Sequence, residues 1–161
     1  MTVFSFFKGV GVFILLVAMH YSIRPMMGTR ISIDFLVIAV LLVAVHVRPG
    51  IAAIIGFVSG LVADSLTPLS FGAGALAMSA VGSAASWLKA AVFGDNVLSQ
   101  VIFLAAGKYV FDIIYLVVER RLDLAALLMQ LLLWSPLSAL ATGLAGALIV
   151  FTFRISMEAR R

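Results

Sequence analysis

Residues 97–118 read VLSQVIFLAAGKYVFDIIYLVV, and this stretch decides what kind of fold the chain can adopt. It is long and apolar enough for a membrane-spanning helix, which needs about 20 residues. Yet Lys108 stands at its centre and Asp112 follows one turn later. A charge at the centre of a bilayer costs on the order of 3 kcal/mol on insertion scales. The face that carries these charges must therefore contact something other than lipid.

Four polar side chains form a single stripe on this predicted helix: Lys108, Asp112, Tyr115 and Glu119. At about 100° per residue, they fall within roughly 60° of one another. Three interpretations stay open. The stripe is an internal Lys108–Asp112 ion pair that fixes helix packing, or it lines a polar cavity or contacts a partner's membrane segment, or it conducts protons or ions.

The composition of the whole chain is that of a membrane protein. Of its 161 residues, 64% are hydrophobic and 11% charged, against about 45–50% and about 25% in soluble domains. We therefore predict an all-α, polytopic membrane helix bundle in which residues 1–161 form a single integral membrane domain. The apolar runs that predict about six transmembrane helices with short loops are 4–22, 32–47, 50–66, 72–91, 97–118 and 125–153. Because the links are short, neighbouring helices are expected to be antiparallel.

The number of spans depends on the segment Val47-Arg48-Pro49-Gly50. Proline and glycine can turn the chain there, which gives six spans, whereas one long bent helix would give five. Six is favoured because Arg48 should not lie in lipid. The last run contains Pro136, which predicts a kink or tilt.

Basic residues in the short loops predict the orientation in the membrane. The face that holds both termini carries six basic residues and the other face carries four, so the termini are expected to be cytoplasmic. The two sets are Lys8, Arg48, Lys89, Arg154, Arg160 and Arg161, and Arg24, Arg30, Arg120 and Arg121.

The sequence lacks the common signatures of enzymes, metal sites and nucleic-acid binding. It has no cysteine and no GxSxG, HExxH or P-loop motif. Its two histidines, His20 and His46, lie at opposite ends of their predicted spans, and each is expected to be an interfacial residue. No basic cluster with interleaved aromatic residues is present to bind nucleic acid. We therefore expect no enzymatic activity, no cofactor and no metal.

The third run contains a face of small residues that ends in an acid. Gly56, Gly60 and Asp64 recur every four residues, a spacing that lets helix backbones approach closely in lipid. This spacing predicts tight packing against the small residues of the run at 72–91. Asp64 is then either a solvated acid at a helix end or an acid turned inward to pair with an arginine or lysine.

The stretch from Ile33 to Ser83 resembles the rod shape-determining protein MreD family. Asp34 matches the acid that opens the second helix in that family, and Arg48-Pro49 matches its charged turn. Gly60-Leu-Val-Ala-Asp64 and Phe71-Gly72 match the motifs that end the third helix and precede the fourth. One departure is that Pro25 and Asp34 are separated by MMGTRISI, whereas the family often has them adjacent.

This resemblance implies a non-enzymatic scaffold of the bacterial cell-elongation machinery, located in the cell (inner) membrane. Its expected partners are the bitopic protein MreC and, within a larger complex, MreB filaments, RodA and a class B penicillin-binding protein. The family is also thought to resemble the substrate-binding subunits of ECF-type vitamin transporters, which are six-helix bundles with an outward-facing pocket. The alternative function is therefore that of a solute-binding transporter subunit, with the helix at 97–118 lining the pocket.

Overall fold

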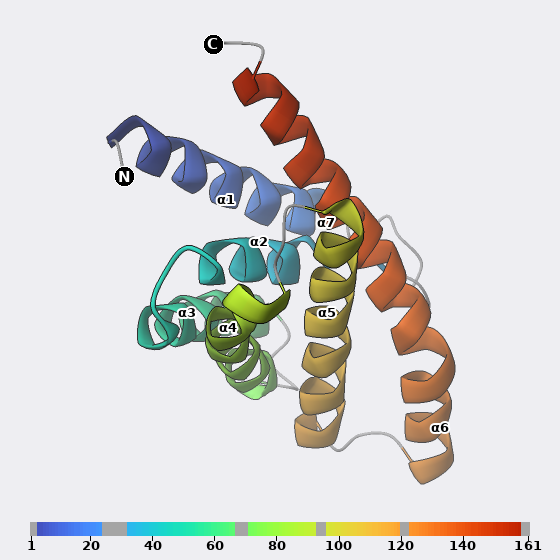
Figure 1. Ribbon diagram of the computed structural model, residues 1–161. Coiled ribbons are helices and arrows are strands. Elements are labelled where there is room, and N and C mark those ends of the chain that lie inside the picture. The colour runs from blue at the N-terminus through green and yellow to red at the C-terminus, as the bar shows by residue number, and fades with distance from the viewer. Residues whose placement is uncertain (1–2, 24–31, 67–70, 93–95, 120–122, 159–161) are drawn as a thin grey trace.

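The computed structural model describes residues 3–23, 32–66, 71–92, 96–119 and 123–158, and all the regular elements in these ranges are helices (Figure 1). The expectation of an all-α chain is confirmed. The helices are α1 (Val3–Ile23), α2 (Phe35–Ala44), α3 (Pro49–Ser65), α4 (Ala73–Val92), α5 (Val97–Glu119), α6 (Leu124–Met129), the π-helical turn η3 (Gln130–Trp134) and α7 (Ser135–Glu158). Since α6, η3 and α7 are continuous, the six apolar runs correspond to six helices. Six of the arginines used to predict the orientation lie outside the described residues. They are Arg24, Arg30, Arg120, Arg121, Arg160 and Arg161.

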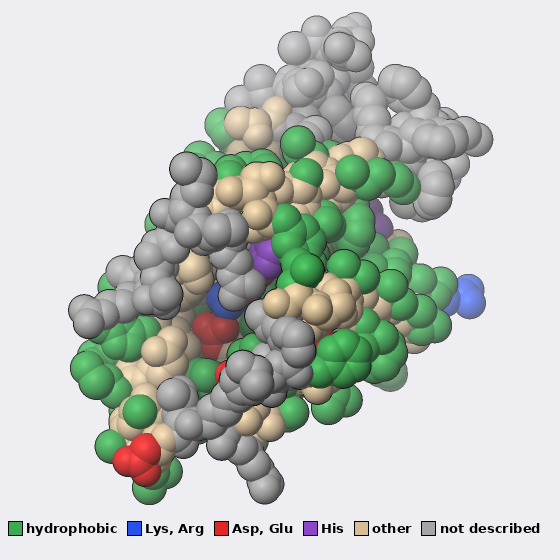
Figure 2. All heavy atoms as spheres, turned by 180° about the vertical axis from the view of Figure 1, so that it is seen from behind, with side chains coloured by type: hydrophobic (Ala, Val, Ile, Leu, Met, Phe, Trp, Pro, Cys, Tyr) green, Lys and Arg blue, Asp and Glu red, His purple; other side chains and the backbone are tan. Residues whose placement is uncertain are grey.

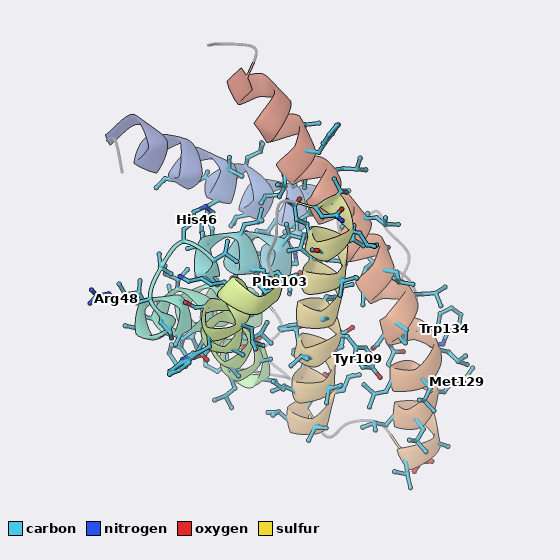
Figure 3. All side chains as sticks on the ribbon, in the orientation of Figure 1. His46, Arg48, Phe103, Tyr109, Met129 and Trp134 are labelled. Atoms are coloured by element: carbon cyan, nitrogen blue, oxygen red, sulfur yellow. The ribbon has the colours of Figure 1, made fainter. Side chains whose placement is uncertain are left out.

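The break between the second and third runs is confirmed. Helix α2 ends at Ala44 and α3 begins at Pro49, where the missing N–H of proline is not needed by the helix. Arg48 occupies the N-cap position of α3 and is exposed. Figure 3 shows Arg48 extending away from the molecule at this corner. A single bent helix through residues 32–66 is therefore excluded.

Helix α2 differs from the expected span in length and in surroundings. Its ten residues extend over about 15 Å at 1.5 Å per residue, which is half of a hydrocarbon core of about 30 Å. Eight of the ten are buried, as expected for a helix that is apolar on all sides. The second run therefore forms the centre of the molecule and is too short to be a full-length span by itself.

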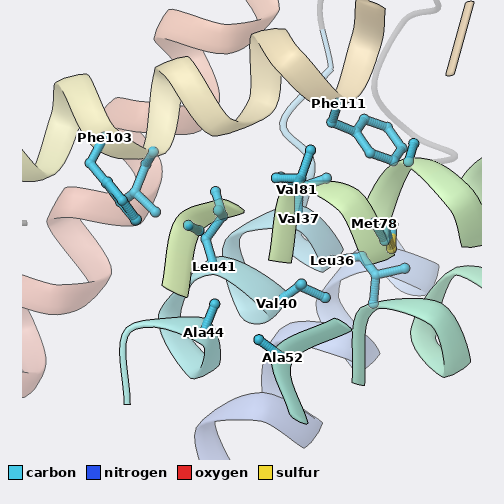
Figure 4. Packing of buried hydrophobic residues seen from close by; sticks show 13 residues of the cluster. Leu36, Val37, Val40, Leu41, Ala44, Ala52, Met78, Val81, Phe103 and Phe111 are labelled. Carbon is cyan, nitrogen blue, oxygen red and sulfur yellow. The ribbon is translucent and has the colours of Figure 1, made fainter. Parts of the chain in front are cut away.

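The other helices are arranged in pairs around α2. Helices α3 and α4 lie side by side, α5 lies beside α7, and α1 packs on α2. Figure 1 shows opposite chain directions within the α1–α2 and α5–α7 pairs, as expected, but α1 and α2 cross α5 steeply in that view. The main core is built where α2 meets α3, α4 and α5, with Leu41, Ala52, Val81 and Phe103 among its members (Figure 4).

The last helix is irregular at the place that the proline predicts. In η3 the N–H of Ser135 donates to the carbonyl of Gln130, five residues earlier, and Pro136 follows directly. Proline cannot donate to the residue four positions before it, so a wider turn accommodates it. Among the described residues, two helices are long and apolar enough to cross a membrane: helix α5 and the continuous helix Leu124–Thr152.

Candidate functional site

The charges of α5 lie in a buried cluster. Lys108 Nζ lies 2.5 Å from Asp112 Oδ1 and 3.2 Å from Asp34 Oδ2. The side chains of Lys108 and Asp34 are 5% and 2% exposed. The predicted ion pair within the helix is therefore confirmed, and a second acid, 74 residues away in the sequence, shares the same ammonium group.

Asp34 is held in place by the start of α2 and by α7. It is the N-cap residue of α2, and its Oδ1 accepts a hydrogen bond from the N–H of Val37 at 3.3 Å, a preferred role for aspartate. Its own N–H donates to Thr142 Oγ1 at 3.2 Å. Two residues earlier, the carbonyl of Ser32 accepts a bond from Ser138 Oγ at 2.6 Å. Helix α7 therefore fixes the backbone that presents the carboxylate to Lys108.

His20 joins the cluster from α1. Its Nδ1 lies 3.2 Å from Asp34 Oδ1 and 3.3 Å from the N–H of Leu36, which donates to it. The expectation that His20 is an interfacial residue is wrong, because α2 and its N-cap cover the side chain and leave only 3% of it exposed. His46, in contrast, is exposed.

Aromatic rings border the cluster on α5. Lys108 Nζ lies 4.9 Å from the ring centroid of Phe111, within the range of a cation–π interaction. Phe111 stacks on Tyr115 with centroids 5.7 Å apart. Of the polar stripe, Lys108 and Asp112 thus form the cluster and Tyr115 lies at its edge. Glu119 is the last residue of α5 and is partly exposed, about 10 Å along the helix from Asp112.

The cluster has a clear structural consequence. It joins α2 and α5 through an ion pair and α1 through His20, while hydroxyl groups of α7 hold the entry to α2. Removing one partner from a buried ion pair costs about 3–5 kcal/mol because the other charge stays buried. In the part of the chain that the structure describes, no set of three or more acidic, histidine or cysteine side chains could hold a metal ion.

Asp64 forms a second buried acidic site, away from the first. Its carboxylate accepts three backbone hydrogen bonds, from Gly72 at 2.9 Å, Gly74 at 3.2 Å and Ala75 at 3.0 Å. The side chain is turned inward, as one of the two interpretations predicts, but these partners are N–H groups at the start of α4. Gly72 has a φ of 97°, which favours glycine. Asp64 thus caps α4 from the neighbouring helix.

The tight packing predicted for the third and fourth runs is confirmed. A Cβ on Gly60 would lie 2.5 Å from Ala75 Cα, and one on Gly56 would overlap the carbonyl of Met78. The backbones of α3 and α4 therefore touch along the small-residue face. Of the residues in the family-like stretch, Gly56, Gly60, Asp64 and Gly72 all act at this contact, whereas Asp34 belongs to the charge cluster.

The contacts that His20 and Thr142 make with Asp34 were not predicted from the sequence. Asp34 directly precedes an apolar run, so its role as an N-cap could have been recognised. His20 lies one turn after the buried Leu16, on the same helix face. Because nearly every residue between them is apolar, the sequence of α1 has no pattern of polar and apolar residues that would identify this face as buried.

Comparison with known proteins finds no match. No family model, no curated protein and no solved structure matches the chain. The functional proposal therefore depends on the motifs in the sequence and on the geometry of the helices.

Proposed function

We propose that this chain is a multi-pass protein of the bacterial cell (inner) membrane that acts as a non-enzymatic scaffold of the cell-elongation machinery. Its partners would be a bitopic protein of the MreC type and, through a larger complex, MreB filaments, RodA and a class B penicillin-binding protein. This proposal extends the resemblance to the MreD family carried by Asp34, Arg48-Pro49, Gly60–Asp64 and Gly72.

The observation that carries the membrane part of the proposal is an inverted distribution of polarity. Large apolar side chains are exposed along several helices, such as Ile54 at 65% on α3, Ile102 at 53% on α5 and Leu148 at 64% on α7. The ionised groups Lys108 and Asp34 are buried instead. Figure 2 shows a largely hydrophobic face with one group of charged and histidine side chains set into a hollow. Lipid would solvate such a surface, whereas water would not.

The positions of the chain ends agree with an even number of crossings. In the view of Figure 1, the start of α1 and the end of α7 lie on the same side of the molecule. The sequence predicts an excess of basic residues on the face that holds both termini, and cytoplasmic termini are therefore part of the proposal. The short α2 would then complete its crossing together with the segments that flank it.

The geometry of the stripe favours a scaffold over a solute-binding subunit. A transporter subunit would use the polar side chains of α5 to line a pocket. Here Lys108 donates to Asp112 within α5 and to Asp34 at the start of α2. The contact with Asp34 joins two helices, which is the role expected of a scaffold.

Co-purification tests the proposal. The tagged chain is expressed together with an MreC-type protein, extracted in a mild detergent and analysed by native mass spectrometry. We expect a stoichiometric complex of the two proteins, and an unrelated bitopic protein of similar size serves as the control. Recovery of a small molecule in place of the partner would support the transporter alternative and refute the scaffold.

The variant Lys108→Met shows whether partner binding needs the cluster, with Arg48→Met as the matched control because Arg48 is exposed. If the cluster holds the helices in the binding arrangement, complex recovery should fall with Lys108→Met and stay unchanged with Arg48→Met.

A further inference from the structure

His20 makes two contacts that require opposite states of the same atom. To accept the N–H of Leu36 at 3.3 Å, Nδ1 must carry a lone pair. To donate to Asp34 Oδ1 at 3.2 Å, the same Nδ1 must carry a proton. A histidine nitrogen is either a donor or an acceptor at any moment, so the proton on Nδ1 decides which of the two contacts is made.

We propose that His20 and Asp34 form a proton-operated latch that holds α1 on the rest of the bundle. Without a proton on Nδ1, the imidazole acts as an acceptor for the first turn of α2. When the ring is protonated, it donates a charge-assisted hydrogen bond to the Asp34 carboxylate. The inference needs only the α1–α2 contact and is independent of the scaffold proposal.

The position of α1 makes such a latch effective. Helix α1 packs chiefly on α2, through a small apolar cluster that contains Leu16, Phe35 and Ile38. His20 lies one turn beyond Leu16 and adds a polar contact at the end of that cluster. A change in this contact therefore acts on the attachment of one helix without disturbing the packing of α3 on α4.

Charged groups lie close to the His20–Asp34 pair. Among the described residues, the ionisable groups around the pair are Lys108 and Asp112 on α5, and Tyr21, whose ring lies 5.3 Å from that of His20. Two carboxylates there share one ammonium group, and imidazolium would add a second cation beside Asp34. Helix α7 contributes the hydroxyl of Thr142.

The expected direction of the effect follows from the strength of the two contacts. A charge-assisted hydrogen bond is roughly twice as strong as a neutral one. We therefore expect α1 to be held more firmly when Nδ1 carries a proton for Asp34 than when it accepts from Leu36. Histidine is the side chain that ordinarily changes charge between pH 5 and 8, which sets the range of the experiment.

The chain allows a direct test because it has only two histidines. His46 is exposed, so His46→Gln leaves His20 as the single histidine in a folded protein. Nitrogen NMR of this variant in detergent micelles or nanodiscs, with labelled histidine, reports whether Nδ1 carries a proton. We expect an acceptor signal at pH 8 and a protonated signal at pH 5. A signal of one form across the whole range would overturn the latch.

A second measurement links the proton to α1. Between pH 8 and pH 5, the backbone amides of α1 should exchange more slowly with deuterium, and the melting temperature should rise by about 3 °C. Both changes should be lost in Asp34→Asn, which keeps an oxygen to cap Val37 but has no carboxylate charge. His20→Gln should lose them as well. Equal pH effects in the parent and in both variants would refute the proposal, even if His20 titrates.

Discussion

At the scale of single residues, Asp34 shows how one side chain can define a site. It caps α2, accepts the ammonium of Lys108 and lies against His20. Each contact satisfies part of a carboxylate that would otherwise be buried without partners, at a cost of several kcal/mol. The stability of the molecule should therefore respond more strongly to these few polar residues than to any single exposed apolar one.

Replacing Lys108 by methionine tests the strength of the cluster. The change leaves Asp34 and Asp112 buried without the ammonium they share, so we expect a loss of about 3–5 kcal/mol in the free energy of unfolding. Arg48→Met, at an exposed position, should change it by about 0.5 kcal/mol at most. Thermal unfolding in detergent, followed by loss of the monodisperse peak, measures both. Similar melting temperatures for the two variants would show that the cluster does not stabilise the fold.

The removal of Asp64 should be costly for a different reason. Asp64→Ala leaves three N–H groups at the start of α4, two of them in buried bonds, without their acceptor, and we expect a loss of about 2 kcal/mol or more. Asp123→Ala is the matched control, because Asp123 caps α6 through Leu124 at an exposed position and water can replace it. For Asp123→Ala, the free energy of unfolding should fall by about 1 kcal/mol or less. A smaller effect for Asp64→Ala than for Asp123→Ala would contradict the buried cap.

At the scale of helices, the molecule uses two ways of packing. The contact between α3 and α4 depends on the absence of side chains, since Gly56 and Gly60 bring backbones into contact. The contacts of α2 depend on large side chains that fill the space between helices, such as Leu36 and Leu41. The first kind gives close approach in lipid, and the second gives α2 its enclosed position.

A pair of glycine-to-alanine changes separates these effects. In Gly60→Ala the new Cβ would lie 2.5 Å from Ala75 Cα and from the carbonyl of Gly74, so α3 and α4 must move apart. Overpacking of this kind costs about 1–3 kcal/mol. In Gly50→Ala nothing lies within 4 Å of the new atom, and the better helix propensity should raise stability by up to about 1 kcal/mol. Opposite shifts of the melting temperature are expected, and equal shifts would rule out the backbone contact.

At the scale of the whole molecule, many large apolar side chains of the described residues are exposed, whereas Lys108, Asp34 and Asp64 are buried. The exposed face of α7 includes Leu140 and Leu144, at 55% and 56%. Such a surface is stable only where its surroundings are apolar as well. Under the proposed function, the lipid bilayer supplies these surroundings.

The double substitution Leu140→Lys and Leu144→Lys tests this environment. In lipid each lysine should cost on the order of 3 kcal/mol, so the fraction of protein that stays in the membrane pellet after alkaline extraction should fall sharply. In water the same change would only improve solubility. His46→Lys, at the exposed α2–α3 corner, is the control and should leave the pellet fraction unchanged. A double variant that still remains fully in the pellet would argue against a lipid-facing α7.

The sequence by itself determined the helical class, the approximate positions of the six helices, the turn at Arg48-Pro49 and the Lys108–Asp112 pair, but not the shortness of α2. These features follow from local rules: apolar length, the backbone limits of proline and the four-residue spacing of a helix. The small-residue contact of α3 with α4 could be predicted for the same reason, since glycine spacing is visible along one helix.

Only the tertiary structure decided the partners of the buried polar groups. Asp34 meets Lys108 across 74 residues, His20 turns inward, and Asp64 binds the backbone of α4 because of how the helices cross. In a chain this apolar, almost every helix face looks alike in the sequence, so hydrophobic periodicity cannot distinguish a buried face from a lipid-facing one. The few hydrogen bonds and ion pairs between helices make that distinction, and they exist only once the chain has folded.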